Sequence, residues 1–377
     1  MVAGETRVVS DGFARRRGRA SIALGAGPLP PVDPDPEFVV GTTMPSRAIN
    51  GPRMPLDVFS GTGAGGIHYV SGNNKVYEGI NFGTTLVKFS GACSGTIFRD
   101  CKWTISKNNL GRDSTVIDMR AANVTNTLIE FCDFDQTAQG NPGMTGVMGS
   151  DFAIKRSNIR NFTDHIGVYM PTSAGGNLNV LVEANHLAAM AWYWHPSDGI
   201  VHPSDNKTHN DLIQNQGGYG LIVRGNYMDA RYSTTLGTGT PGSGSESVSG
   251  IGYTYAQGVN ARYSVVEGGG TYSSGNPGAF LGGSIAGLMY TNGNRGTIYN
   301  NTVVDNWCKG GSFFINAGST QNVSPWGSVY RNRFTRDQRT AGWAIGIRSG
   351  VTVNVGAGTS NRNIWTDDNS EVLRKNA

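Results

Sequence analysis

The chain is poor in charge and lacks long apolar runs, and each shortage argues against a class of protein. Only 15% of its 377 residues are charged, and no stretch shows the 3.6-residue periodicity of amphipathic helices, which argues against a large helical protein. No apolar run approaches the roughly 20 residues of a membrane helix, so we expect no membrane insertion. The net charge of +4 is mild, and no basic run interleaved with aromatics continues beyond the N-terminus, which argues against nucleic-acid binding.

Cysteine is also scarce, and the four cysteines show neither CxxC pairs nor the spacing of metal ligands. Three of them lie in or beside strand-like phrases, so we expect small buried thiols rather than disulfides. They are Cys93, Cys101, Cys132 and Cys308.

The first 50 residues differ in composition from the rest. A basic cluster at 15–19 precedes a proline-rich stretch at 27–36. The apolar run between them faintly resembles a signal peptide, but Gly25 and Gly27 break it too early. A segment of this kind buries little by itself, so we predict an extended N-terminal arm over residues 1–50, either disordered or ordered by a partner.

What the chain does contain is a repeat. A strand-like phrase with Asn or Cys at its fifth place returns along the chain, and aligning the phrases predicts one column of equivalent positions at intervals of 21, 31, 26, 27, 41, 75, 31 and 31 residues. Periods in this range indicate a solenoid. The predicted column is Ile80, Cys101, Cys132, Asn158, Asn185, Asn226, Asn301, Asn332 and Asn363.

We therefore predict an all-β fold, a right-handed single-stranded parallel β-helix over residues 51–377, with insertions near 188–208 and 229–285. An Asn at a tight bend would bond the equivalent groups one coil above and below and would tolerate left-handed backbone angles. The apolar content of 38% suits a thin solenoid that buries alternate residues. Stacked coils would also place Val182, Val223, Ile298 and Val329 in one interior column.

The first insertion holds the candidate substrate-binding rings Trp192, Tyr193 and Trp194. Aromatic faces bury the apolar side of a pyranose, so these rings could form a platform for sugars; the alternative is that they pack the loop onto the solenoid wall. Part of the second insertion, rich in Gly, Ser and Thr, is predicted to protrude. Solenoid insertions tend to emerge on one face and build a binding surface there.

Acidic side chains nearby are the candidates for hydrolysis. Glycosidic hydrolysis needs two carboxyl groups about 5 to 5.5 Å apart for retention, or about 6.5 to 9.5 Å apart for inversion. Asp198, Asp205 and Asp211 lie 7 and 6 residues apart along the chain. A calcium ion held by the same three residues is the only cofactor that we considered, and no EF-hand or nonapeptide spacing supports it.

Lyase chemistry would instead need a base, for which His209 is the candidate, and a cation beside a uronate, for which Lys207 or Arg224 is the candidate. In a strand, His209 and Asp211 would share one exterior face. The alternative for both is a structural role, in which they hydrogen-bond to the flanking loop.

The phrase from His209 through Gly218 to Asn226, with the pattern H-x-D-x-I-Q…G-N, resembles right-handed β-helix proteins of the pectate-lyase-like superfamily. That superfamily includes polysaccharide lyases and hydrolases, phage tailspikes, and β-helical minor tail proteins of phages that infect actinobacteria. The resemblance in coil pattern covers about 300 residues, and the specific motif covers about 20.

The chain resembles the phage minor tail proteins best. This resemblance implies a virion protein in the phage tail, spike-like or fibre-like, whose N-terminal arm docks onto other tail proteins and whose solenoid binds a host cell-envelope glycan. It also implies a homotrimer as one assembly, although no heptad segment follows Trp365. Two alternatives stay open: a polysaccharide depolymerase, either lyase or glycoside hydrolase, and a purely structural tail component. Binding without cleavage is our preferred hypothesis.

Overall fold

The computed structural model describes residues 38–61, 66–106, 114–121, 123–137, 144–169, 178–191, 211–215, 217, 219–232, 286–290, 300–310, 314–317, 327–335, 344–347 and 352–372, and the strands at 6–7 and 374–376. Within these ranges the protein is all-β and contains no helix. No segment of them could cross a membrane as a long apolar helix.

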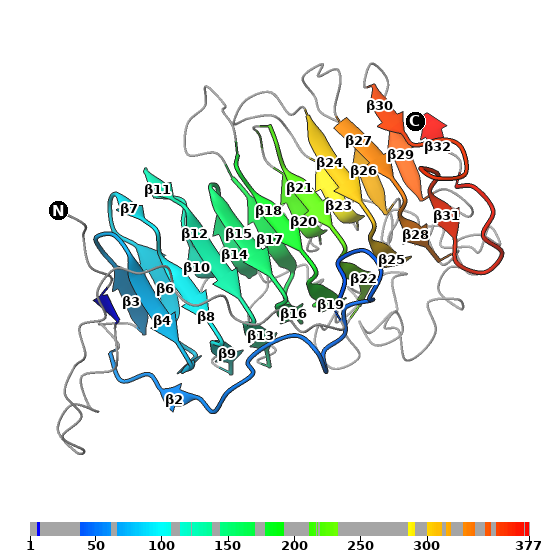
Figure 1. Cartoon of the computed structure of the whole chain (residues 1–377). Coiled ribbons are helices and arrows are strands. Elements are labelled where there is room, and N and C mark those ends of the chain that lie inside the picture. Colours follow the sequence, from blue (N-terminus) through cyan, green and yellow to red (C-terminus); the bar gives the residue numbers. More distant parts are fainter. Residues whose placement is uncertain are drawn as a thin grey trace, which may run out of the picture.

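Three ten-stranded sheets, which we call A, B and C, make up the fold (Figure 1). Sheet A contains β1 (Thr6–Arg7), β4 (Lys75–Glu78), β8 (Ile97–Arg99), β12 (Thr127–Glu130), β15 (Phe152–Lys155), β18 (Leu181–Glu183), β21 (Ile222–Arg224), β24 (Asn301–Val304), β27 (Gly327–Tyr330) and β30 (Val353–Val355).

Sheet B contains β2 (Asp57–Val58), β5 (Ile80–Gly83), β9 (Lys102–Ile105), β13 (Asp133–Gln136), β16 (Asn158–Arg160), β19 (His186–Met190), β22 (Tyr227–Tyr232), β25 (Trp307–Gly310), β28 (Arg333–Phe334) and β31 (Ile364–Trp365).

Sheet C contains β3 (Ile67–Val70), β6 (Leu86–Phe89), β10 (Thr115–Asp118), β14 (Thr145–Gly149), β17 (Asp164–Val168), β20 (Asp211–Asn215), β23 (Ala286–Tyr290), β26 (Ile315–Ala317), β29 (Ile345–Ile347) and β32 (Arg374–Asn376). A short pair, β7 (Cys93–Ser94) and β11 (Val124–Thr125), lies between sheets C and A in the chain.

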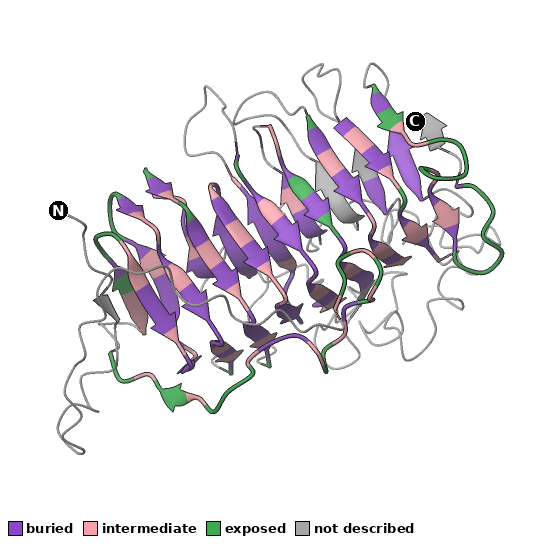
Figure 2. Cartoon of the chain, viewed as in Figure 1, coloured by how far each residue is buried: buried purple, intermediate pink, exposed green. Residues whose placement is uncertain are grey.

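The chain passes from sheet A to B to C and back to A, and each strand pairs in parallel with its equivalent one coil away. The three long all-parallel sheets confirm the all-β prediction and are consistent with a solenoid of the parallel β-helix type. Each coil buries its inward residues only because neighbouring coils continue the column, so stacking stabilises the rod. The strands are largely buried, while exposed residues gather at corners and connections (Figure 2).

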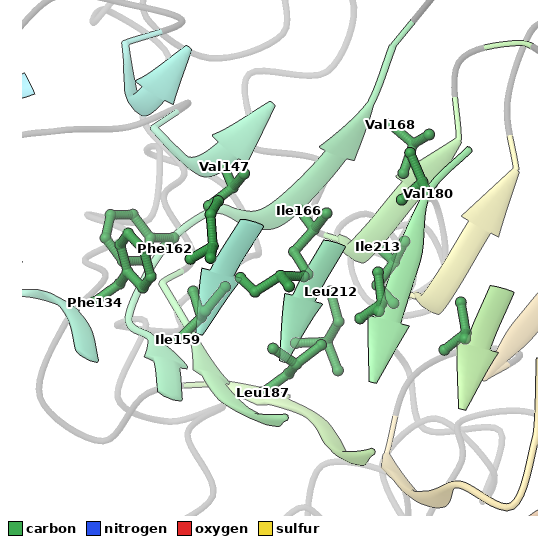
Figure 3. Packing of buried hydrophobic residues seen from close by; sticks show 14 of the residues in the cluster. Phe134, Val147, Ile159, Phe162, Ile166, Val168, Val180, Leu187, Leu212 and Ile213 are labelled. Atoms are coloured by element: carbon green, nitrogen blue, oxygen red, sulfur yellow. The ribbon is translucent and has the colours of Figure 1, made fainter. Parts of the chain in front are cut away.

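Apolar side chains fill the space between the sheets, as Ile159, Leu187 and Leu212 do in Figure 3. On the inner side of sheet B, Phe82, Trp103 and Phe134 stack with ring centroids 4.6 and 4.7 Å apart and planes within 2° of parallel. Sheet A continues the core with an in-register column: Tyr77, Phe98, Ile129, Ile154, Val182, Val223, Val303, Val329 and Val355. Val303 takes the place that we predicted for Ile298, which lies outside the described residues.

The corner between sheets A and B carries a hydrogen-bonded ladder of side chains. Asn185 N–H donates to Asn226 Oδ1 at 2.9 Å, and Asn226 N–H donates to Asn306 Oδ1 at 2.9 Å. Each ladder amide also donates inward, as when Asn226 Nδ2 bonds the Val182 carbonyl at 2.9 Å. The ladder runs through Ser157, Asn185, Asn226, Asn306, Asn332 and Asn363.

Two members of the predicted column were therefore wrong. Ser157 replaces Asn158, because its hydroxyl accepts the Cys132 N–H at 3.1 Å and donates to the Lys155 carbonyl at 2.8 Å. Asn306 replaces Asn301, because Val223 of β21 pairs with Val303 of β24, five residues later in the chain than the predicted partner Ile298.

The cysteines of the predicted column donate, through a shorter side chain, to the backbone carbonyl equivalent to the one that the ladder Asn side chains bond. The Cys132 thiol lies 3.4 Å from the Glu130 carbonyl, two residues earlier, as the Asn226 amide lies 3.1 Å from that of Arg224. All four cysteines are buried and free of disulfides, as predicted.

The left-handed backbone at this corner belongs to the residue before the ladder position at Ser157, Asn185, Asn226, Asn306 and Asn332, not to the ladder residue. Ala184 has φ 56°, Gly225 has φ 64° and Arg331 has φ 54°. The predicted reason for Asn at the bend was therefore only half right. Asn is favoured at the ladder position because of its side-chain hydrogen bonds, while the residue before it adopts the unfavourable backbone conformation.

Residues 38–60, which we call the corner strap, lie along the A–B corner in the direction opposite to coil growth (Figure 1). Asn50 Nδ2 donates to the Ala184 carbonyl at 2.9 Å, and Arg53 forms a bidentate pair with Asp100 at 2.8 and 3.0 Å. The strap ends as β2, which pairs with β5. It therefore ties several coils together from outside.

Long connections leave from a different corner. Between β4 and β28, every connection from sheet A to sheet B is one or two residues long. In contrast, residues 191–210 separate β19 from β20, and residues 233–285 separate β22 from β23. Both long connections join sheet B to sheet C. The interval of 80 residues from Asn226 to Asn306 thus holds one coil with a long insertion.

Candidate functional site

Most of the predicted site residues belong to the connection between β19 and β20 and lie outside the described residues. These are Trp192, Tyr193, Trp194, Asp198, Asp205, Lys207 and His209. Their roles stay predictions.

Asp211 begins β20 and is completely buried. Gln214 Nε2 donates to Asp211 Oδ2 at 3.1 Å, and the Asp211 N–H donates to Asp164 Oδ1 on the neighbouring strand at 2.9 Å. These bonds hold the end of the first insertion against sheet C. The structure thus provides a structural role for Asp211, and its catalytic role stays a prediction.

Arg224 lies on the outer side of sheet A, where its guanidinium binds Glu183 through Nε at 2.8 Å and through Nη2. Glu183 also faces Lys155, with 3.7 Å between Lys155 Nζ and Glu183 Oε1. The pair is one end of a column of alternating charge, in register through Glu78, Arg99, Glu130, Lys155, Glu183 and Arg224. Arg224 therefore already has a carboxylate partner of its own.

A second face carries rings and cations without such compensation. The first outward residue of successive sheet B strands forms an in-register column, which we call the outer strip and define as His186, Tyr227, Trp307 and Arg333 together with Lys309. The rings are half-buried. Because each follows a ladder Asn in the chain, the ladder positions them on a rigid, evenly spaced support.

The rings of the outer strip pack against one another and against cations. His186 and Tyr227 stack with centroids 5.0 Å apart and planes 7° apart. Lys309 Nζ lies 5.4 Å from the Tyr227 ring, and the Arg333 guanidinium lies 4.7 Å from the Trp307 ring. Such cation–π contacts occupy ring faces and leave ring edges, the positive part of the aromatic quadrupole, toward solvent.

Burial lowers the pKa of His186 to about 4; Asp229 opposes this shift, and the charges of Arg160 and Arg47 add to it. His186 is therefore neutral at physiological pH, and the positive charge of the strip comes from its lysine and arginine. Tyr227 Oη donates to Asp229 Oδ2 at 3.3 Å, which fixes the ring end.

The outer strip lies at the A–B end of the sheet B strands, and both long insertions leave from the other end of β19 and β22. His186 begins β19, which leads into residues 191–210, and Tyr227 begins β22, which leads into residues 233–285. Of the strip residues, His186 thus lies on the strand whose continuation holds the predicted ring platform at 192–194.

Within the described part of the chain, no group of three or more His, Cys, Asp or Glu side chains is arranged to hold a metal ion. Asp198 and Asp205 lie outside that part.

We missed the outer strip in the sequence, although a signal was present. Asn185-His186, Asn226-Tyr227, Asn306-Trp307 and Asn332-Arg333 are four ladder residues, each followed directly by a large ring or cation. The misplaced register at Asn301 hid this pattern.

No protein-family model matches the chain, and neither a curated protein nor a solved structure shows significant similarity to it.

Proposed function

We propose that this chain is a bacteriophage minor tail protein, spike-like or fibre-like, that binds a host cell-envelope glycan during adsorption. The observation that carries the glycan-binding part of the proposal is the outer strip, a rigid row of ring edges and cation heads on the outer face of sheet B, whose strands β19 and β22 lead into the two insertions. The weakly positive ring edges and the cationic heads suit the hydroxyl and acidic oxygens of a long polysaccharide.

The remaining parts of the proposal follow from the resemblance to phage tail proteins. The chain would occupy the phage tail, with residues 1–50 joining other tail proteins, and the rod would wind to the right, as crossover connections between parallel strands nearly always do. A homotrimer is the proposed assembly. Trp192, Tyr193, Trp194 and Lys207 would extend the binding surface from the first insertion.

The test is retention of host envelope polysaccharide on immobilised protein. We expect retention without new reducing ends and without unsaturated uronate absorbance. Tyr227→Ala and Trp307→Ala should each weaken retention, because they remove ring edges and the support of Lys309 and Arg333. The matched control is Tyr69→Ala, which removes a 56% exposed ring from sheet C.

Two outcomes would contradict the proposal. Loss of retention in the Tyr69 variant equal to that in the strip variants would show that the strip is not the site. Release of shorter oligosaccharides would favour the depolymerase, in which case His209→Ala and Asp211→Ala should abolish cleavage.

A further inference from the structure

We infer that the outer strip selects an acidic glycan, a polymer bearing carboxylate or phosphate groups, over a neutral one. This inference rests on the proposed function and names the chemistry of its ligand.

The outer strip and the adjoining part of the corner strap have a local excess of positive charge. Lys309 and Arg333 of the strip, and the exposed Arg47 of the corner strap beside His186, have no carboxylate within 4 Å in the part of the chain that the structure describes. Among the described residues, Asp229 supplies a carboxylate that accepts a hydrogen bond from the Tyr227 hydroxyl. Lys309, Arg333 and Arg47 together with Asp229 carry a net charge of +2.

Two arginines close to the strip, unlike its own cations, are paired with carboxylates. Arg160, on the same sheet, binds Asp133 at 2.9 Å and Asp135 at 2.6 Å. Arg331, two residues before Arg333, binds Asp305 at 2.7 Å. The strip cations thus differ from these two neighbouring arginines, and unmatched cations attract an anion from outside.

The spacing of Lys309 and Arg333 also suits an acidic polymer. Lys309 and Trp307 are both on β25, and Arg333 pairs with Trp307 from the next strand, so the two charged heads arise from adjacent strands. Adjacent strands lie about 4.8 Å apart, which is close to the length of a pyranose. A polymer lying along the rod axis would therefore bring successive acidic groups within reach of both heads.

The experiment compares polygalacturonate with its fully methyl-esterified form, which has the same backbone without the charge, using the full chain. We expect binding of polygalacturonate and little binding of the ester. Lys309→Gln and Arg333→Gln should each weaken the dissociation constant about tenfold, the usual effect of removing one charge-assisted hydrogen bond. Arg331→Gln, which lowers the net charge equally, should change it less than about twofold. Urea unfolding midpoints of all three variants check that the fold is intact.

Equal affinity for the acid and the ester, or an equal loss in the Arg331 variant, overturns the inference. If the protein retains a neutral host polysaccharide but binds none of polygalacturonate, alginate and teichoic acid, this inference fails while the proposed function stands. If it retains no host envelope polysaccharide at all, the proposed function fails as well.

Discussion

Asn226→Ala is expected to destabilise the protein far more than the loss of an ordinary polar side chain. Its amide nitrogen donates to the carbonyls of Val182 and Arg224 at 2.9 and 3.1 Å and to Asn306 Oδ1 at 2.9 Å. Its oxygen accepts the backbone N–H of Asn185 at 2.9 Å and the Asn185 amide at 3.0 Å. Alanine can replace none of these bonds.

The magnitude follows from the groups left without partners. Each buried polar group that loses its hydrogen bond costs about 1 to 3 kcal/mol. With two to three such groups around Asn226, the free energy of unfolding should fall by about 3 to 6 kcal/mol. Because whole proteins are stable by only about 5 to 15 kcal/mol, this loss is large enough to measure directly.

The assay is urea unfolding followed by circular dichroism, with two comparators. Asn226→Ser should cost less than alanine, because Ser157 occupies the equivalent ladder position and both accepts and donates there. Asn354→Ala removes an exposed Asn from β30 and should cost less than about 0.5 kcal/mol. A cost for Asn226→Ala that is no greater than for Asn354→Ala would refute the ladder as a source of stability.

Three further predictions concern acid stability, backbone strain and surface charge. The His165 imidazole is fully buried, and neither ring nitrogen has a hydrogen-bond partner in the described structure. Burial lowers the pKa of His165 from 6.5 to about 3, and the nearby His186 adds a smaller effect in the same direction. Between these values only the unfolded chain binds the proton, so His165 should contribute a loss of stability of about 1.4 kcal/mol per pH unit as the pH drops below 6.5. His165→Leu should remove this contribution, while His186, whose pKa burial lowers to about 4, keeps its own; an unchanged slope in urea titrations at pH 4 to 7 contradicts this. Ala184→Gly should raise the unfolding free energy by up to about 1 kcal/mol, since glycine relieves the left-handed φ of 56°, and a decrease would mean that packing of its methyl group matters more. Arg224→Gln should leave glycan retention unchanged, because its guanidinium is bound by Glu183 on sheet A, and weaker retention would return Arg224 to the site.

The coil pattern predicted the fold class, because inward residues and corner residues must recur at every turn of a solenoid. The same pattern predicted the free, buried cysteines. Val182 and Val223 fall in one interior column as expected. These features depend on period alone, which the sequence displays directly.

Register was harder to predict, because neighbouring residues offer the same chemistry. Ser157 and Asn158 are adjacent, and either can bond the corner backbone. Asn301 and Asn306 both precede apolar residues within one strand phrase. Only the pairing of β21 with β24 shows that Asn306, and not Asn301, is the ladder residue. This pairing is visible in the three-dimensional structure and not in the sequence.

The outer strip could have been found only after the register was right. His186, Tyr227 and Trp307 are separated by 41 and 80 residues in the chain, and nothing local links them. Once the ladder Asn residues are aligned, the residues that follow them form one row. The candidate residues of the first insertion could be chosen by composition, but their arrangement in space depends on a long connection that no repeat constrains.

A crystal structure of the protein with bound tetragalacturonate tests the central claim most directly. We predict that the sugar lies along sheet B against Tyr227 and Trp307, with its carboxylates bound by Lys309 and Arg333. Tetragalacturonate bound to another face, or an unoccupied outer strip at saturating ligand, would contradict the account.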